Sequence, residues 1–371
     1  MNIIIINCFD TYEHRVDLLF ENFTEAGHTV AVLTSDYQHI QKTKRNIDKC
    51  GYHFFAATPY KKNISLQRVC SHIKLSKNIF DYVEKHINTI DLLWVFVPPN
   101  IFVKAAADIK RKNKNIKLIL DLIDLWPESM PINGVKNIFP FKYWKDLRDR
   151  HLKIADFIVT ECNLYRLILK KSLNQTKVET LYLARPLEKH ISELNLPDRE
   201  IALCYLGSIN NIIDIDCIED IIKKCQEYKP VVFHIIGDGE NKIKLVSKIK
   251  NTGAKVIDHG IIYDRNKKQQ IFDTCHYGLN IMKKSVCVGL TMKSIDYLEF
   301  GLPIINNIHG DTWDAVEVYN IGMNYTGKGI HWNYLENIIQ RKKAREFFEL
   351  FLTEMDFRRK VNNILEKIIY E

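Results

Sequence analysis

The residues between Gly289 and Pro303 have the types and spacing of an anion-binding helix start. A glycine-containing loop opens a helical pattern, and the backbone amides at such a start favour a negatively charged ligand. Lys293 lies in the first turn and adds a mobile positive charge suited to a diphosphate. Asp296 follows one turn later and can accept paired hydrogen bonds from a ribose diol. An ordinary amphipathic helix with a capping loop is the alternative interpretation.

A second group of polar residues follows an apolar run in the first half of the chain. The predicted strand 116–123 leads into Asp124-Leu125-Trp126-Pro127, and acids followed by tryptophan and proline are unusual for a plain connection. We expect Asp124 to hydrogen-bond a hydroxyl of a ligand, and Asp121 to face the neighbouring strands. The alternative is an acidic loop that surrounds a buried tryptophan.

The loop after the first apolar run carries His14 and Arg15. Both side chains could meet an anionic ligand, because this loop also lies at the carboxyl end of a predicted strand. A solvent-exposed helix start, capped by Thr11, explains the same residues equally well.

The elements that position these residues form an alternating pattern of short apolar strands and amphipathic helices, which predicts parallel sheets covered on both faces. Predicted strands are 3–7, 29–34, 53–57, 92–97, 116–123, 157–160, 178–183, 201–206, 231–236, 255–257, 277–281 and 303–306. Predicted helices are 16–26, 65–86, 101–112, 141–154, 216–224, 242–250, 264–273, 294–300 and 335 to the end.

A polar stretch at 185–198 interrupts this pattern, and we take it as a linker between two domains. We expect an N-terminal Rossmann-like domain at 1–188, joined by the terminal helix at about 350–371, which crosses back to it. The second Rossmann-like domain is expected at 189–349. Ligands of such sheets gather beyond the carboxyl ends of the strands, so the expected site is a central cleft that the two domains face.

Composition excludes several classes of protein. The 371 residues are 46% hydrophobic and carry a net charge of +8, but the basic clusters are short and match no nucleic-acid-binding module. No apolar run reaches the roughly 18 residues of a membrane span, and the start of the chain lacks the features of a signal peptide, so we expect a cytoplasmic protein. The nine cysteines form no C-x-x-C pair, and no metal site is expected.

The Gly289 segment resembles the donor-binding motif of retaining GT-B glycosyltransferases of family 4, which typically reads Lys-x-x-Glu-Tyr-x-x-x-Gly-x-Pro-Val-Ile. In this chain Asp296 replaces the usual glutamate, and Val288 stands where many members carry an earlier glutamate. The run 121–129 resembles the D-x-x-D-L-W-P-E-S signature of members that build capsule and lipopolysaccharide. Six positions match the donor-binding motif in register: Lys293, Asp296, Tyr297, Gly301, Pro303 and Ile305.

The resemblance implies a set of site residues. Lys293 would neutralise the leaving diphosphate, Asp124 would contact the donor sugar or the acceptor hydroxyl, and these two are the expected catalytic residues. His14, Arg15 and Asp124 are the expected acceptor-binding residues. The expected donor-binding residues are Gly207, Ser208, Gly237, Gly260, Ile262, Gly289, Leu290, Thr291, Lys293 and Asp296.

The resemblance also implies a reaction. We expect a hexosyltransferase that moves a sugar from a nucleotide diphosphate, UDP above all, to a cell-surface polysaccharide or lipid-linked glycan precursor, with retention and without a metal or other cofactor. Peripheral contact with the inner face of the cell membrane fits such an acceptor. Three alternatives remain open: an inverting transferase with Asp124 as base, a sugar-nucleotide epimerase, and a non-catalytic partner of another transferase. A dehydrogenase is excluded, because no G-x-G-x-x-G follows the first strand.

Overall fold

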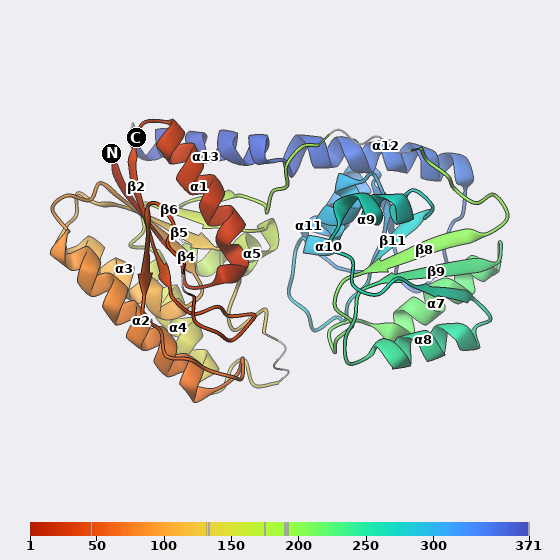
Figure 1. The fold of residues 1–371 in the computed structure, drawn as a ribbon, viewed down its shortest axis with the longest axis horizontal. Coiled ribbons are helices and arrows are strands. Elements are labelled where there is room, and N and C mark those ends of the chain that lie inside the picture. Colours follow the sequence, from red (N-terminus) through yellow and green to blue (C-terminus); the bar gives the residue numbers. More distant parts are fainter. Residues whose placement is uncertain (46, 131, 133, 174–175, 189–192, 370–371) are drawn as a thin grey trace. The chain divides into compact units, whose positions relative to one another are not determined.

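The computed structural model describes residues 1–45, 47–130, 132, 134–173, 176–188 and 193–369. The chain forms two compact units (Figure 1). The N-terminal unit comprises Met1–Ala184 and Phe357–Glu371, and the C-terminal unit comprises Arg185–Asp356. The first boundary thus lies four residues before the one expected at 188, and the returning segment begins at 357 rather than at about 350.

The N-terminal unit is built on a seven-stranded sheet in the order β3-β2-β1-β4-β5-β6-β7, and every neighbouring pair is parallel. All six residues of β4 are buried, as expected of a central strand covered on both faces. The strands are β1 (Asn2–Ile6), β2 (Thr29–Ser35), β3 (Tyr52–Phe55), β4 (Leu92–Val97), β5 (Lys117–Leu122), β6 (Phe157–Thr160) and β7 (Lys177–Thr180).

Helices cover both faces of this sheet. Apolar residues of α1 (Glu13–Glu25) and α13 (Glu354–Ile369) pack against one face in a single core cluster. On the other face lie α2 (Leu66–Lys85), α3 (Asn100–Lys112) and α4 (Phe141–Leu152) (Figure 1). Three short elements complete the unit, namely η1 (Asp10–Tyr12), α5 (Asn163–Ile168) and α6 (Lys170–Leu173).

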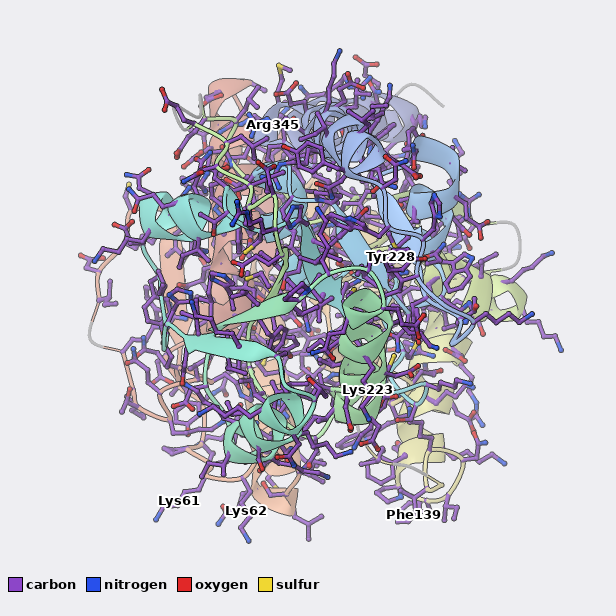
Figure 2. All side chains as sticks on the ribbon, turned by 90° about the vertical axis from the view of Figure 1, so that its right-hand side faces the viewer. Lys61, Lys62, Phe139, Lys223, Tyr228 and Arg345 are labelled. Carbon is purple, nitrogen blue, oxygen red and sulfur yellow. The ribbon has the colours of Figure 1, made fainter. Side chains whose placement is uncertain are left out.

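The C-terminal unit has a six-stranded parallel sheet in the order β10-β9-β8-β11-β12-β13. Its strands are β8 (Ile201–Leu206), β9 (Val231–Ile236), β10 (Lys255–Asp258), β11 (Tyr277–Asn280), β12 (Ile304–Asn306) and β13 (Gly322–Asn324). Its helices are α7 (Ile215–Gln226), α8 (Lys242–Asn251), α9 (Arg265–Phe272), α10 (Met292–Glu299), α11 (Asp311–Tyr319) and α12 (Tyr334–Phe351). The apolar face of α7 packs into the core, so the opposite face, which carries Lys223, is turned to solvent (Figure 2). The expected α/β class with two parallel sheets is therefore confirmed.

The expectation of one continuous terminal helix from Leu335 is wrong. The helix breaks at Leu352 and Thr353, where Arg185 pairs with Thr353 as a β-bridge. The Arg185 amide donates to the Leu352 carbonyl at 2.9 Å, and the Glu354 amide donates to the Arg185 carbonyl at 3.1 Å. These bonds replace helical ones, so α12 ends and α13 begins.

No helix in the described part of the chain is long and apolar enough to cross a membrane.

Candidate functional site

Glycine loops gather at the carboxyl edge of the C-terminal sheet. Gly207 follows β8, Gly237 follows β9 and Gly260 lies after β10, and all three have positive φ (117°, 146° and 67°). A Cβ on Gly237 would lie 2.0 Å from the Gly207 carbonyl oxygen, so only glycine allows these loops to touch. The Gly237 amide also donates to the Gly260 carbonyl at 2.7 Å. We call these loops, together with the start of α10 at Thr291, the glycine edge.

The start of α10 is fixed at the same edge of the sheet. Thr291 caps the helix by accepting from the Ser294 amide at 3.1 Å, and Ser294 reciprocates by accepting from the Thr291 amide. The Thr291 hydroxyl donates to the Asn280 side chain at the end of β11, at 2.7 Å. The helix start is thus tied to the end of a central strand.

Lys293 lies over the ring of Tyr205 in β8. Its Nζ is 4.4 Å from the ring centroid and donates to the Tyr205 hydroxyl at 3.2 Å. Burial lowers the pKa of Lys293 to about 7, because desolvation penalises the charged amine. An anion that docked here would restore the charge, so this lysine is suited to respond to a phosphate.

Asp296 is held by two cations that the sequence analysis missed. Arg185 Nη2 lies 3.3 Å from Oδ1 of Asp296, and Lys268 Nζ lies 3.6 Å from Oδ2. Each carboxylate oxygen can accept more than one hydrogen bond, so a ribose diol can share this group with its cations. Next to it, Glu299 is buried against Arg265, and burial raises the Glu299 pKa to about 7. The cations come from the linker and α9, and no local pattern links these segments to α10.

Tyr297 of the motif has a structural role. Its hydroxyl accepts from the Leu206 amide at 2.6 Å and donates to the Cys204 carbonyl at 3.2 Å, which ties α10 to the end of β8. A Cβ on Gly278 would lie 2.7 Å from the Tyr297 ring, so the glycine in β11 makes room for it.

The remaining predicted donor-binding residues differ in exposure. Ser208 is exposed, and its carbonyl accepts from the Tyr205 hydroxyl at 3.0 Å. Gly289 is buried, and its carbonyl accepts from the Thr312 amide at 2.9 Å, so α11 supports this loop. Leu290 is buried and Ile262 is partly exposed, so Leu290 can reach a ligand only through its backbone.

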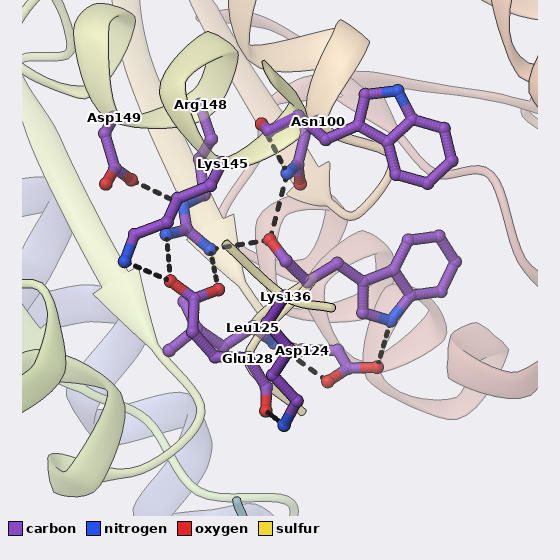
Figure 3. A network of polar contacts seen from close by, with 10 residues as sticks. Asn100, Asp124, Leu125, Glu128, Lys136, Lys145, Arg148 and Asp149 are labelled. Atoms are coloured by element: carbon purple, nitrogen blue, oxygen red, sulfur yellow. Dashed lines mark hydrogen bonds and ion pairs between the residues drawn. The ribbon is translucent and has the colours of Figure 1, made fainter. Parts of the chain in front are cut away.

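In the N-terminal unit, Asp124 organises the loop after β5. Its Oδ1 accepts from the Leu125 amide at 2.8 Å, and its Oδ2 accepts from the Trp126 indole at 2.7 Å (Figure 3). Oδ1 also accepts from the Ser129 hydroxyl. Burial raises the Asp124 pKa, and the three donated hydrogen bonds oppose that rise.

Glu128 anchors the same loop to α4. The guanidinium of Arg148 is fully buried and binds both Glu128 oxygens at 2.9 Å, with a further bond to the Trp126 carbonyl at 2.8 Å (Figure 3). Asn100 donates to the same carbonyl at 3.0 Å. Asp124 and Glu128 therefore lock the two ends of the segment that presents the Trp126 ring.

The expectation that Arg15 binds an acceptor is wrong. Arg15 is 2% exposed and forms a bidentate pair with Asp121, at 3.0 and 2.9 Å. It also donates to the carbonyls of Leu181 and Tyr182. The guanidinium joins the first helix to the centre of the sheet and is unavailable to a ligand. His14, by contrast, is exposed at the start of α1.

Arg68 of α2 is the main residue near Asp124 that the sequence analysis missed. Its guanidinium lies 4.4 Å from the Trp126 ring centroid, 5.2 Å from that of Phe9 and 5.7 Å from that of Tyr60. The side chain is 7% exposed, and its Nε has no hydrogen-bond partner. In the sequence Arg68 occupies an amphipathic helix, where an arginine is expected to face solvent.

Within the described residues, no group of three or more His, Cys, Asp or Glu side chains is placed to hold a metal ion. Independence of metals stays a prediction.

No model of a known protein family matches the chain, and a search of curated proteins finds no match. Solved structures resemble it over its whole length. Sucrose-phosphate synthase from Thermosynechococcus elongatus has a TM-score of 0.70 at 13% identity, covering 100% of this chain and 99% of that one. HepE from Anabaena, in complex with UDP and glucose, has a TM-score of 0.64 at 11% identity, covering 99% of each chain. The lipopolysaccharide outer core galactosyltransferase WaaB has a TM-score of 0.65 at 13% identity, covering 98% of this chain and 99% of that one. The chain therefore has the fold of these proteins, the two-domain α/β fold known as GT-B.

Proposed function

We propose that this chain is a retaining glycosyltransferase of the family 4 type, which moves a sugar from UDP to a cell-surface polysaccharide or lipid-linked glycan precursor. One observation carries the proposal. At the glycine edge, Lys293 lies over Tyr205 beside the Gly207 loop, in the first turn of a helix capped by Thr291. A cation, a helix start and a glycine loop together favour a diphosphate.

Transfer would break the bond between the anomeric carbon and the diphosphate oxygen and form a bond to the acceptor oxygen on the same face. The acceptor proton would pass to the departing diphosphate. Positioning and stabilisation of the negative charge that develops on the leaving group would supply the catalysis. Lys293 and the start of α10 are the groups of this chain suited to that task, without a metal.

Asp124 suits orientation of the acceptor better than removal of its proton. Two hydrogen bonds occupy Oδ1 and one occupies Oδ2, which leaves a single lone-pair direction on Oδ2 for a hydroxyl. The Asp124 pKa is raised on balance by burial, so the occupied lone pairs, rather than a low basicity, are what limit removal of the acceptor proton. This arrangement favours retention over an inverting mechanism with Asp124 as base.

Similar structures support the choice of donor and acceptor. HepE was solved with UDP and glucose, and WaaB is described as a galactosyltransferase of the lipopolysaccharide outer core. A UDP-sugar and a surface glycan are therefore the first substrates to test.

The test incubates purified protein with a panel of UDP-sugars and a short-chain lipid-linked acceptor, and follows UDP release and the anomeric configuration of the product by NMR. We expect α-configured donors to give α-linked products. Lys293→Ala should lower turnover at least about a hundredfold, whereas Lys342→Ala, which removes an 80% exposed lysine of α12, should not. Wild-type turnover in Lys293→Ala would refute the diphosphate site.

The same assay separates the alternatives. Conversion of the UDP-sugar without any acceptor would identify an epimerase. Inverted product would favour Asp124 as a base. A rise in melting temperature with UDP-sugars but no turnover with any acceptor would identify a non-catalytic partner, because a ligand that binds only the folded state stabilises it.

A further inference from the structure

An apolar groove lies between α2 and α4 in the N-terminal unit. It consists of two adjoining pockets of about 530 and 660 Å³, open to solvent, that share Val69, His72, Trp126 and Trp144. We call them together the Trp126 groove. Leu66, Arg68, Ile73 and Tyr143 also line it.

The rim of the Trp126 groove exposes large apolar side chains. Leu66 is 81% exposed, Tyr143 56% and Ile73 53%, and Phe139, which precedes α4, is 80% exposed. Phe139 projects outward from the surface (Figure 2). Apolar side chains gathered around a hollow usually mark a binding surface.

A buried cation lines the Trp126 groove. Arg68 is 7% exposed, and its Nη1 donates to the Asn63 carbonyl at 2.7 Å, but its Nε lacks a hydrogen-bond partner. Nε2 of His72, which is 6% exposed, lacks a partner as well. Unpaired buried donors are costly unless a ligand satisfies them. Burial and the Arg68 charge lower the His72 pKa, so its neutral ring adds no charge of its own.

The charge carried by the lining of the Trp126 groove is positive. Among the described residues that line the two pockets, Arg68 is the sole charged one, and none is an aspartate or a glutamate. Lys61 and Lys62 are exposed on the segment that leads into α2, and their side chains extend into solvent (Figure 2). Lys142 is exposed in the first turn of α4. An apolar groove with a buried guanidinium in its lining matches a ligand with a long hydrocarbon chain and a phosphate.

We propose that the Trp126 groove binds the hydrocarbon chain of a phosphate-linked lipid acceptor, with Arg68 and the start of α2 receiving the phosphate. The proposal rests on the function proposed above and specifies its acceptor. Trp126 lines both pockets and donates to Asp124, so a sugar attached to the phosphate would extend from Arg68 toward Asp124. Along the site, the hydrocarbon chain of the lipid would come first, the phosphate second and the sugar third.

The experiment measures binding without catalysis. Dodecyl phosphate, dodecanol and inorganic phosphate are titrated separately into the full-length protein below micellar concentrations, by calorimetry and by tryptophan fluorescence, since Trp126 and Trp144 line the groove. We expect dodecyl phosphate to bind at least about tenfold more tightly than dodecanol, and inorganic phosphate not to bind measurably.

Two variants locate the site. Arg68→Met should weaken dodecyl phosphate about tenfold or more and leave dodecanol unchanged. Ile73→Glu alters a half-exposed side chain that the fold does not need, and should weaken both amphiphiles. Ile243→Glu, on the 86% exposed Ile243 of α8, is the matched control and should bind like the wild type.

Three results would overturn the proposal. Equal affinity for dodecyl phosphate and dodecanol would show that no phosphate is recognised. Binding that survives Ile73→Glu would place the ligand elsewhere. The third result combines two observations: the protein binds anionic vesicles equally well with and without Arg68→Met, and it does not bind monomeric dodecyl phosphate. That result would identify a membrane-contact surface instead. UDP-sugar binding is measured in the same samples, so loss of the donor site and loss of the lipid site are recognised separately.

Discussion

The indole N–H of Trp126 donates to Oδ2 of Asp124 at 2.7 Å, and this contact fixes the partly exposed Trp126 ring to the carboxylate at the start of the loop after β5. We predict that Trp126→Phe keeps the ring but releases Asp124. The acceptor KM or kcat should worsen about tenfold, in line with loss of one hydrogen bond to a charged group, while the KM for the UDP-sugar stays the same. Steady-state kinetics with each substrate varied would check this. Trp313→Phe, which removes an exposed indole bond to Glu317, is the control.

The buried amine of Lys293 should lower the free energy of unfolding of the ligand-free protein. Because burial lowers its pKa from 10.5 to about 7, the folded state binds fewer protons than the unfolded state between these values. The free energy of unfolding should therefore fall as the pH drops from about 10 to 7. Lys293→Met removes this penalty and should stabilise the ligand-free protein at neutral pH by on the order of 1–3 kcal/mol. Urea unfolding of both proteins across this pH range would measure the difference, and a less stable Lys293→Met would contradict the burial argument.

The same lysine predicts how donor affinity depends on pH. A diphosphate favours charged Lys293, so binding above pH 7 requires uptake of a proton, and affinity should fall by up to about tenfold per pH unit as the pH rises above 7. UDP-glucose is the suitable ligand, because its esterified diphosphate does not titrate near neutral pH. Calorimetry in buffers of different ionisation enthalpy would count the protons. Lys293→Arg, which stays charged, should make the affinity nearly independent of pH.

Asp296→Ala should weaken the binding of the ribose without weakening the binding of the diphosphate. We expect affinity for UDP to fall about tenfold through loss of the ribose contacts, because charged hydrogen bonds contribute this much. Affinity for inorganic pyrophosphate should hold or rise, since Arg185 and Lys268 lose their anionic partner. Competition binding would compare the two ligands. Asp314→Ala, which changes an exposed aspartate of α11, serves as the control, and parallel losses for both ligands would argue against the assignment.

Arg148 should be required for stability of the loop after β5. Arg148→Met leaves Glu128 without its bidentate partner and the Trp126 carbonyl without one of its donors. Removal of one member of a buried ion pair typically costs about 3–5 kcal/mol. Thermal unfolding should show the loss, and Arg150→Met, at a 75% exposed position two residues later, should show almost none. If the two variants had the same melting temperature, the network in Figure 3 would not be stabilising the loop.

Local periodicity predicted most of the elements. The Ile3–Ile6 run lies within β1, and the helix predicted at 65–86 is α2 with Ser65 as its cap. Helix α11 and strand β13 were missed, because both are short and their apolar residues lack a clear period. The break at Leu352 was missed for a different reason. It depends on pairing with Arg185, which is far away in the sequence.

Some of the site residues could be predicted from local sequence, and others could not. The start of α10 could be predicted, because a cap, a lysine and a terminating glycine lie within a few residues of one another. The partners of charged side chains could not be predicted from local sequence. Arg15 was assigned to a ligand although its partner is Asp121, and Arg68, which three rings surround, was not singled out at all. Such partners are set by contacts between distant segments, which a single sequence does not display.

Helix α13 has a consequence for how the protein is made. Its residues Val361, Ile364 and Leu365 complete the core on one face of the seven-stranded sheet, yet they are synthesised after the whole C-terminal unit. Domains generally fold in the order in which they leave the ribosome. Here residues 185–356 precede the last covering helix of the N-terminal sheet, so they are synthesised before that earlier-made sheet can receive its full cover. Part of one apolar sheet face therefore lacks its final cover until the segment that contains Leu365 has been synthesised and has left the ribosome.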